Sequence, residues 1–167
     1  MIWRQRGQRN GLTLIEVALV VAMAAVLFSS ASALFTATST REGIKAKAAE
    51  VAALIDQARN NAIAGFQSDT WGIRVLDNDP VNGDCVVLYK GSNYSTRSTS
   101  YDRMVQINNG FYLESTQQND FYFTYNSGWL ASTTYANLPE QAIAIKSTSG
   151  AMKNVSTTPF GLVYYGD

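Results

Sequence analysis

Histidine is absent from this 167-residue sequence, and Cys85 is its single cysteine. Without histidine, the chain has neither a Ser-His-Asp triad nor a Cys-His pair, and it lacks the common zinc ligand sets. A lone cysteine also excludes a disulfide within the chain. Carboxylate pairs remain available for hydrolysis, but the spacing of the acids from Asp77 onward marks no pair. We therefore expect a protein that is not an enzyme and that uses no cofactor and no metal.

Proline is scarce as well, with three residues of which Pro80 is the first. No proline therefore kinks or breaks a helix before that position. The length of 167 residues suits about one domain with its own hydrophobic core.

The charges are balanced overall but unevenly distributed along the chain. The sequence has 13 basic and 13 acidic side chains, and Arg4, Arg6 and Arg9 all precede the first long apolar run. Without these three arginines, ten basic side chains face thirteen acidic ones. Because a mildly acidic chain has no general affinity for nucleic acid, we do not expect a nucleic-acid partner.

The first apolar run begins directly after a glycine and contains one acid. Residues 8–23 read QRNGLTLIEVALVVAM, so that Gly11 precedes Leu12 and Glu16 lies inside the run. Continued to residue 35, the run makes about 36 Å of helix, enough for a bilayer core of about 30 Å. The preceding arginines place the N-terminal end in the cytoplasm. We expect a leader at residues 1–11 and a transmembrane helix at residues 12–35.

Two simpler interpretations compete for this segment. An ordinary secretory signal peptide would be cut after the A-x-A pattern at residues 31–33 and release a soluble protein that begins at Leu34. A simple signal anchor would hold a periplasmic domain without being cut. Both leave Glu16 without a role, although a carboxylate inside a membrane helix is costly and is a functional-site hypothesis by default.

The basic leader, Gly11, an apolar Leu12 and Glu16 inside the run resemble the class III signal of type IV pilins and type II secretion pseudopilins. This resemblance implies that a prepilin peptidase cuts between Gly11 and Leu12 and N-methylates Leu12. It also implies that Glu16 pairs with the Leu12 amine of a neighbouring subunit during filament assembly. The first mature residue of this family is usually Phe, and Leu12 favours a minor subunit over a major one.

The resemblance also implies where the chain resides and what it contacts. The expected partners are the prepilin peptidase, other pilins or pseudopilins, an inner-membrane assembly platform, and membrane lipid before assembly. The chain would first cross the inner membrane once, with the head in the periplasm, and then enter an extracytoplasmic filament.

Residues 36–66 form an amphipathic continuation of the same helix. Apolar residues recur in steps of three and four, which is helical spacing, at Ile44, Ala48, Val51, Ile55, Ala58, Ala62 and Phe66. The pattern predicts one helix over residues 12–64, and its weakest part is the Thr- and Ser-rich stretch that ends at Gly43.

Residues 67–167 have the pattern of a β-rich globular head. Seven β-branched and aromatic runs lie between turn residues, namely WGIRVL, CVVLYK, MVQI, FYL, FYFTY, AIAIK and FGLVYY. We expect an α+β, pilin-like fold in which the long N-terminal helix packs with its stripe against one of two antiparallel sheets.

The end of the predicted helix and the head that follows it also resemble the minor pseudopilin H (GspH) and FimT-like group. The resemblance rests on ALIDQARNNAIAGF, WGIRV, the turn at residues 126–128, and the closing run at residues 158–165 with Gly161. It implies a minor structural subunit of a type II secretion pseudopilus or a type IV pilus. The alternatives are a membrane-anchored periplasmic binding module that does not polymerise and a FimT-like minor pilin for DNA uptake.

Three further candidate sites have simpler explanations. The acidic stretch 77–84 offers oxygen ligands, but its glycine and acid spacing does not fit an EF-hand, and a hairpin turn accounts for it. The basic residues Arg74, Lys90, Arg97 and Arg103 are scattered, which predicts a solvated surface rather than a DNA site. The aromatic residues between Phe121 and Trp129 predict a sheet core in preference to a glycan or partner groove.

Overall fold

The structure is a computed structural model that describes residues 13–108, 110–115, 120–132 and 139–166. Its contacts divide the chain into two compact units, one that ends at Ser39 and one that runs from Thr40 to Asp167. A single helix, α1 (Leu14–Ile63), provides residues to both units. The helix predicted from the sequence is therefore present, with its ends within two residues of those expected.

Apart from Thr13, the described residues of the first unit are all helical, and their large apolar side chains are uncovered. Leu14 is 88% exposed and Phe28 is 76% exposed, and the large apolar side chains between them are exposed as well. The structure does not support the membrane span expected for residues 12–35: among the residues it describes, no helix is both long and apolar enough to cross a bilayer.

The second unit contains two antiparallel sheets. One has the order β3-β2-β1-β5-β6 and the other the order β4-β7-β8-β9. The strand bounds are β1 Trp71–Asp79, β2 Gly83–Lys90, β3 Ser98–Gln106, β4 Phe111–Ser115, β5 Asp120–Phe123, β6 Leu130–Ala131, β7 Gln141–Ser147, β8 Met152–Thr157 and β9 Val163–Gly166. Two short 3-10 helices, η1 (Phe66–Ser68) and η2 (Tyr94–Thr96), precede β1 and β3. The β-rich head expected from the sequence is thus present.

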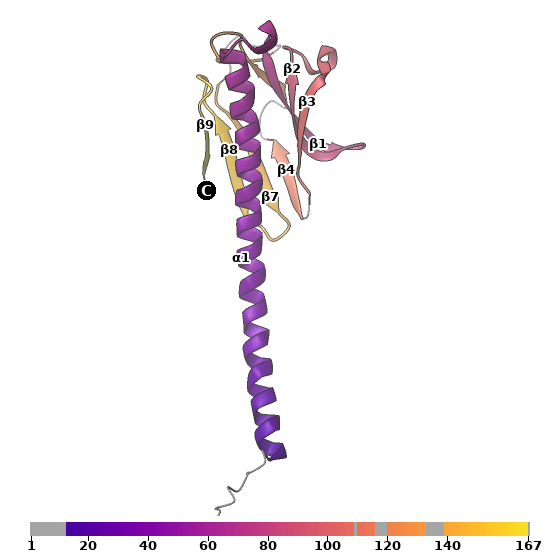
Figure 1. The fold of residues 1–167 in the computed structure, drawn as a ribbon, viewed down its shortest axis with the longest axis vertical. Coiled ribbons are helices and arrows are strands. Elements are labelled where there is room, and N and C mark those ends of the chain that lie inside the picture. The colour runs from indigo at the N-terminus through magenta and orange to yellow at the C-terminus, as the bar shows by residue number, and fades with distance from the viewer. Residues whose placement is uncertain (1–12, 109, 116–119, 133–138, 167) are drawn as a thin grey trace, which may run out of the picture. The chain divides into compact units, whose positions relative to one another are not determined.

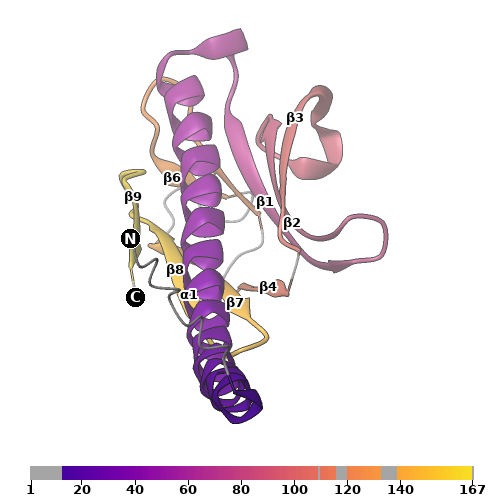
Figure 2. The ribbon, with the colours of Figure 1, turned by 60° about the horizontal axis from the view of Figure 1, so that its bottom comes forward.

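The apolar stripe of α1 forms the centre of the core in this unit. Six of its seven predicted members, from Ile44 to Ala62, are buried. Phe66 differs because α1 has ended before it, and its ring lies half-exposed in η1. In both views, α1 from Thr40 onward runs alongside β7 and β8 (Figure 1, Figure 2).

The helix packs against both sheets, whereas the sequence predicted contact with one. The core cluster joins the stripe to Ile73 and Phe123 of the first sheet and to Ile143 and Val155 of the second. Gly43 contributes to this packing, because a Cβ built there would lie 2.9 Å from Cζ of Phe111 in β4. The weakest position of the predicted helix is therefore where a strand approaches it closely.

Two strands were not predicted. β6 has only two residues, and β8, with the sequence MKNVST, has more polar than apolar residues. β8 lies between β7 and β9, and these neighbours provide the ladder that its own composition does not indicate. The predicted run FYFTY also ends early as a strand, because β5 stops at Phe123 and a turn follows.

Candidate functional site

The N-terminus of α1 is organised around Glu16. The Glu16 carboxylate accepts hydrogen bonds from the backbone N–H and the hydroxyl of Thr13, both at 3.0 Å, and the Glu16 N–H donates to the Thr13 hydroxyl at 3.3 Å. This reciprocal pattern is a capping box, which satisfies backbone donors that the first turn of a helix leaves free. The sequence signal was the spacing T-x-x-E, which sequence reasoning did not use. Glu16 itself is exposed.

Gly11 and Leu12, the predicted processing and methylation positions, lie outside the described residues. The predicted pairing of Glu16 with a neighbour's Leu12 amine therefore stays a prediction. The structure does place Glu16 at the N-terminal end of α1, three residues from the first described residue, Thr13.

The apolar surface beyond Glu16 extends around the helix. The exposed large side chains include Leu19, Val20, Val21 and Met23, which at about 100° per residue lie on different sides of the helix. A helix that is apolar on all sides is normally buried, either in a large core or in another apolar phase. This part of α1 therefore needs cover that the chain alone does not provide.

The acidic stretch 77–84 forms the tip of the β1–β2 hairpin, as turn chemistry predicted. Asp79 Oδ1 accepts hydrogen bonds from the backbone N–H groups of Val81 and Asn82, at 3.0 and 2.8 Å. Asp84 accepts from the N–H groups of Asn78 and Leu113. Within the described part of the chain, no group of three or more acidic, cysteine or histidine side chains is placed to hold a metal.

The basic residues considered for DNA contact have partners in the structure. Arg97 Nε lies 2.8 Å from Asp102 Oδ2, and Lys90 Nζ lies 3.8 Å from Asp69 Oδ2. Arg74 Nη1 lies 3.7 Å from an Asp120 oxygen. Ion pairs of this kind offset the positive charge that phosphate contacts require, so nothing in this group favours a nucleic-acid surface.

The aromatic residues 121–129 divide as the sequence predicted. Phe121 and Phe123 are buried in the core, with their rings edge to face at 6.2 Å. Tyr125 and Trp129 are partly exposed, and the Trp129 ring contacts Phe160 edge to face at 5.8 Å. Alternate residues of β5 thus face the core, whereas the Tyr125 and Trp129 rings beyond the strand lie partly at the surface.

The backbone at Gly128 and Gly161 packs closely against the C-terminal turns of α1. The Asn126 N–H donates to the Ala62 carbonyl at 3.0 Å, which satisfies one of the free carbonyl groups at the helix end. A Cβ built on Gly128 would lie 2.5 Å from Ile63, and one built on Gly161 would lie 2.5 Å from the Gly128 carbonyl oxygen. Both glycines also have a positive φ, so their lack of a side chain permits this close approach.

Tyr89 lies buried on the side of the first sheet that faces away from Trp71. Its ring lies over Gly72, where a Cβ would come within 2.2 Å of the ring, and its hydroxyl donates to Asp120. Burial, together with the hydrogen bond to Asp120, raises the pKa of Tyr89 above its usual value.

We expect this raised pKa to make Tyr89 a source of alkaline instability. Because the folded pKa exceeds the unfolded value of about 10, the contribution of Tyr89 is complete below about pH 10 and is lost as the pH rises further. Tyr89→Phe should cost about 1 kcal/mol at neutral pH. Its unfolding free energy should then fall less steeply with pH than that of the wild type, as measured by urea unfolding. Parallel pH dependences of the two proteins would contradict the assignment.

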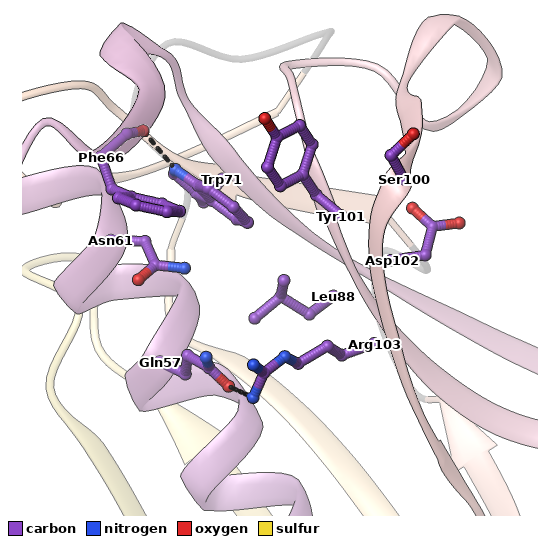
Figure 3. Close-up of a pocket in the computed structure, with 9 residues that line it drawn as sticks. All are labelled: Gln57, Asn61, Phe66, Trp71, Leu88, Ser100, Tyr101, Asp102 and Arg103. Carbon is purple, nitrogen blue, oxygen red and sulfur yellow. Dashed lines mark hydrogen bonds between the residues drawn. The ribbon is translucent and has the colours of Figure 1, made fainter.

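A pocket lies between the C-terminal part of α1 and the edge strand β3, with a volume of about 350 Å³. Figure 3 shows Gln57 and Asn61 of α1 on one side, and Tyr101, Asp102 and Arg103 of β3 on the other. Sequence reasoning missed this pocket, because its residues come from segments far apart in the chain and carry no common motif.

Comparison with known proteins gives a match to a solved structure. No family model and no curated protein match the chain. Among solved structures, it is similar to the crystal structure of the type IV minor pilin FimU of Pseudomonas aeruginosa strain PAO1. The two are 20% identical, the match covers 77% of this chain and 91% of that chain, and the TM-score is 0.54. The chain therefore has a pilin-like fold.

Proposed function

We propose that this chain is a minor structural subunit of a type IV pilus or a type II secretion pseudopilus, incorporated through the N-terminal part of α1. The observation that carries the proposal is the uncovered apolar surface of α1 around residues 14–28, joined to a head with the fold of a minor pilin. Packing among similar helices in a filament would bury this surface without any further domain. Small residues such as Ala18, Ala22 and Ala25 would let such helices approach closely.

Under this proposal, Glu16 acts between subunits. In an apolar filament core, an unpaired carboxylate or ammonium group would be strongly penalised. Pairing Glu16 with the Leu12 amine of a neighbour would offset both charges and fix the axial register between subunits. Until then, the capping box with Thr13 gives the carboxylate hydrogen bonds within its own chain. Assembly would therefore exchange local hydrogen bonds for an ion pair.

The proposed partners follow from this route. A prepilin peptidase would expose the Leu12 amine, an inner-membrane assembly platform would deliver the subunit, and other pilins or pseudopilins would surround it. The similarity in fold to FimU supports the assignment of this chain as a pilin-like subunit. Leu12, at a position where this family usually has Phe, supports a minor rather than a major subunit.

The mature N-terminus tests this proposal directly. We expect the intact mass of the chain purified from its native host to correspond to a start at Leu12 with one added methyl group. Gly11→Val should abolish this processing and leave Met1 in place. A wild-type start at Leu34 would instead identify a secretory signal peptide, and an uncut wild-type chain would identify a simple anchor. Either of these results would contradict the proposal.

A further inference from the structure

The second sheet ends in a strand, β9, whose outer edge is free among the described residues. The sheet order β4-β7-β8-β9 gives β9 only one neighbour, and β9 lies outside β8 in both views (Figure 1, Figure 2). The strand has the sequence VYYG, with no charged residue and no proline. The free edge of a strand presents unpaired backbone N–H and C=O groups, to which another strand can bind.

The register of the sheet identifies which backbone groups of β9 are free. The Thr158 N–H donates to the Leu162 carbonyl at 2.9 Å, and in an antiparallel pair only alternate residues bond across the ladder. The backbone hydrogen bond that closes the β7–β8 turn gives the same alternation. The N–H and C=O groups of Val163 and Tyr165 therefore point away from β8. Within the described part of the chain, no residue bonds to these four groups.

The other three sheet edges are protected, each in a different way. At the β4 edge, the Leu113 N–H donates to Asp84 Oδ2 at 2.8 Å. At the β6 edge, the Leu130 N–H donates to the Pro159 carbonyl at 3.0 Å. The edge strand β3 contains an aspartate followed by an arginine, and charged side chains on an edge strand oppose pairing with another strand. As far as the structure describes the chain, β9 has none of these protections.

The side chains of β9 leave room for a further strand on both faces. Tyr164 is 47% exposed and Tyr165 is 55% exposed, and successive side chains of a strand point to opposite faces. Leu162, directly before the strand, is exposed as well. Aromatic and β-branched side chains on an added strand would form favourable cross-strand pairs with these residues. The edge therefore fits an uncharged, extended segment that contains apolar residues.

We propose that the free edge of β9 pairs with an extended segment in the head of a neighbouring pilin or pseudopilin, which adds a fifth strand to the second sheet. This inference rests on the proposed function. The backbone of the neighbour would satisfy the free N–H and C=O groups of Val163 and Tyr165.

The strand β9 of a second copy does not fit this role. Antiparallel pairing of β9 with itself would be a two-fold contact, which closes into a dimer. Subunits of a filament are instead related by head-to-tail contacts that do not close, so that two different surfaces meet. The partner segment is therefore expected to be a different part of a neighbouring head.

The test compares two substitutions of Tyr165 in the full-length chain. Tyr165→Pro removes the outward N–H and leaves the bonds between β8 and β9 in place, because proline is tolerated on an edge strand where the N–H faces outward. Tyr165→Thr removes the same ring but keeps the N–H. We expect incorporation into sheared filaments to fall at least about tenfold for Tyr165→Pro and less than about threefold for Tyr165→Thr. Near-UV circular dichroism establishes that both variants are folded.

A photo-cross-linking amino acid at position 165 identifies the partner independently of the proline variant. We expect it to cross-link, in intact filaments, to the head of a neighbouring pilin or pseudopilin. Equal incorporation of Tyr165→Pro and Tyr165→Thr would overturn the inference. So would a cross-link to β9 of a second copy, or no cross-link to another subunit. Absence of the wild-type chain from filaments would contradict the proposed function, and the inference with it.

Discussion

Glu16→Gln should reduce incorporation of this chain into filaments by about 100-fold or more, while leaving the helix intact. The amide keeps an oxygen that can accept hydrogen bonds from Thr13, so the capping box loses little. It removes the negative charge, however, and leaves the Leu12 amine of a neighbour unpaired in an apolar core. Breaking a buried ion pair by removing one partner costs about 3–5 kcal/mol. The measurement is the ratio of chain in sheared filaments to chain in whole cells.

The matched control separates this role from helix capping. Thr13→Val removes the hydroxyl that accepts from the Glu16 N–H and donates to its carboxylate, but it leaves the charge. It should cost about 1 kcal/mol of helix stability and leave incorporation close to the wild type. If Thr13→Val reduced incorporation as strongly as Glu16→Gln, then Glu16 would act as a local cap, and the pairing mechanism would be wrong.

Gly161→Ala is expected to destabilise the head by about 3 kcal/mol or more. Gly161 has φ +79°, where a residue with a Cβ is strained by about 1–2 kcal/mol. The added methyl group would also lie 2.5 Å from the Gly128 carbonyl oxygen and 2.7 Å from Arg59 Nε. The nearest of these atoms belongs to the backbone and cannot move aside cheaply, so overpacking should add about 1–3 kcal/mol.

Gly150→Ala isolates the backbone strain from the clash. Gly150 has a similar φ of +90°, but nothing lies within 4 Å of a Cβ built there. This variant should lose about 1–2 kcal/mol, the strain alone. Urea unfolding of both full-length variants, followed by near-UV circular dichroism, gives the comparison. If both variants lost the same unfolding free energy, the close packing of Gly161 against Gly128 and Arg59 would not require a residue without a side chain.

The helix was the part of the fold that the sequence predicted best, because its signal is local. The spacing from Ile44 to Ala62 reports directly which side of α1 faces a core, and all six of those positions are buried. The contact of the stripe with both sheets could not be predicted in the same way. It depends on which strands, far along the chain, pack against α1. The sequence indicated only that Gly43 is an unfavourable residue within a helix. Its packing role depends on Phe111, which lies far along the chain and packs closely against it.

The candidate sites show the same division between local and long-range signals. The hairpin at residues 77–84 was predicted from its turn chemistry, and the capping box of Thr13 and Glu16, although it was not predicted, has a signal that lies within four consecutive residues. The pocket at β3 was not readable, because Asn61, Trp71 and Asp102 meet only through tertiary packing. β8 escaped prediction because its neighbours, rather than its own side chains, make it a strand.

The central claim is that the first part of α1 packs among the helices of other subunits. It is tested most directly by a photo-cross-linking amino acid placed at Leu19, which is exposed in the chain alone, with a control at Val81 on the β1–β2 hairpin. We predict that position 19 cross-links in intact filaments to the N-terminal helix of another pilin or pseudopilin, and that position 81 does not reach such a helix. Filaments in which position 19 gives no cross-link to another subunit's helix would contradict the account.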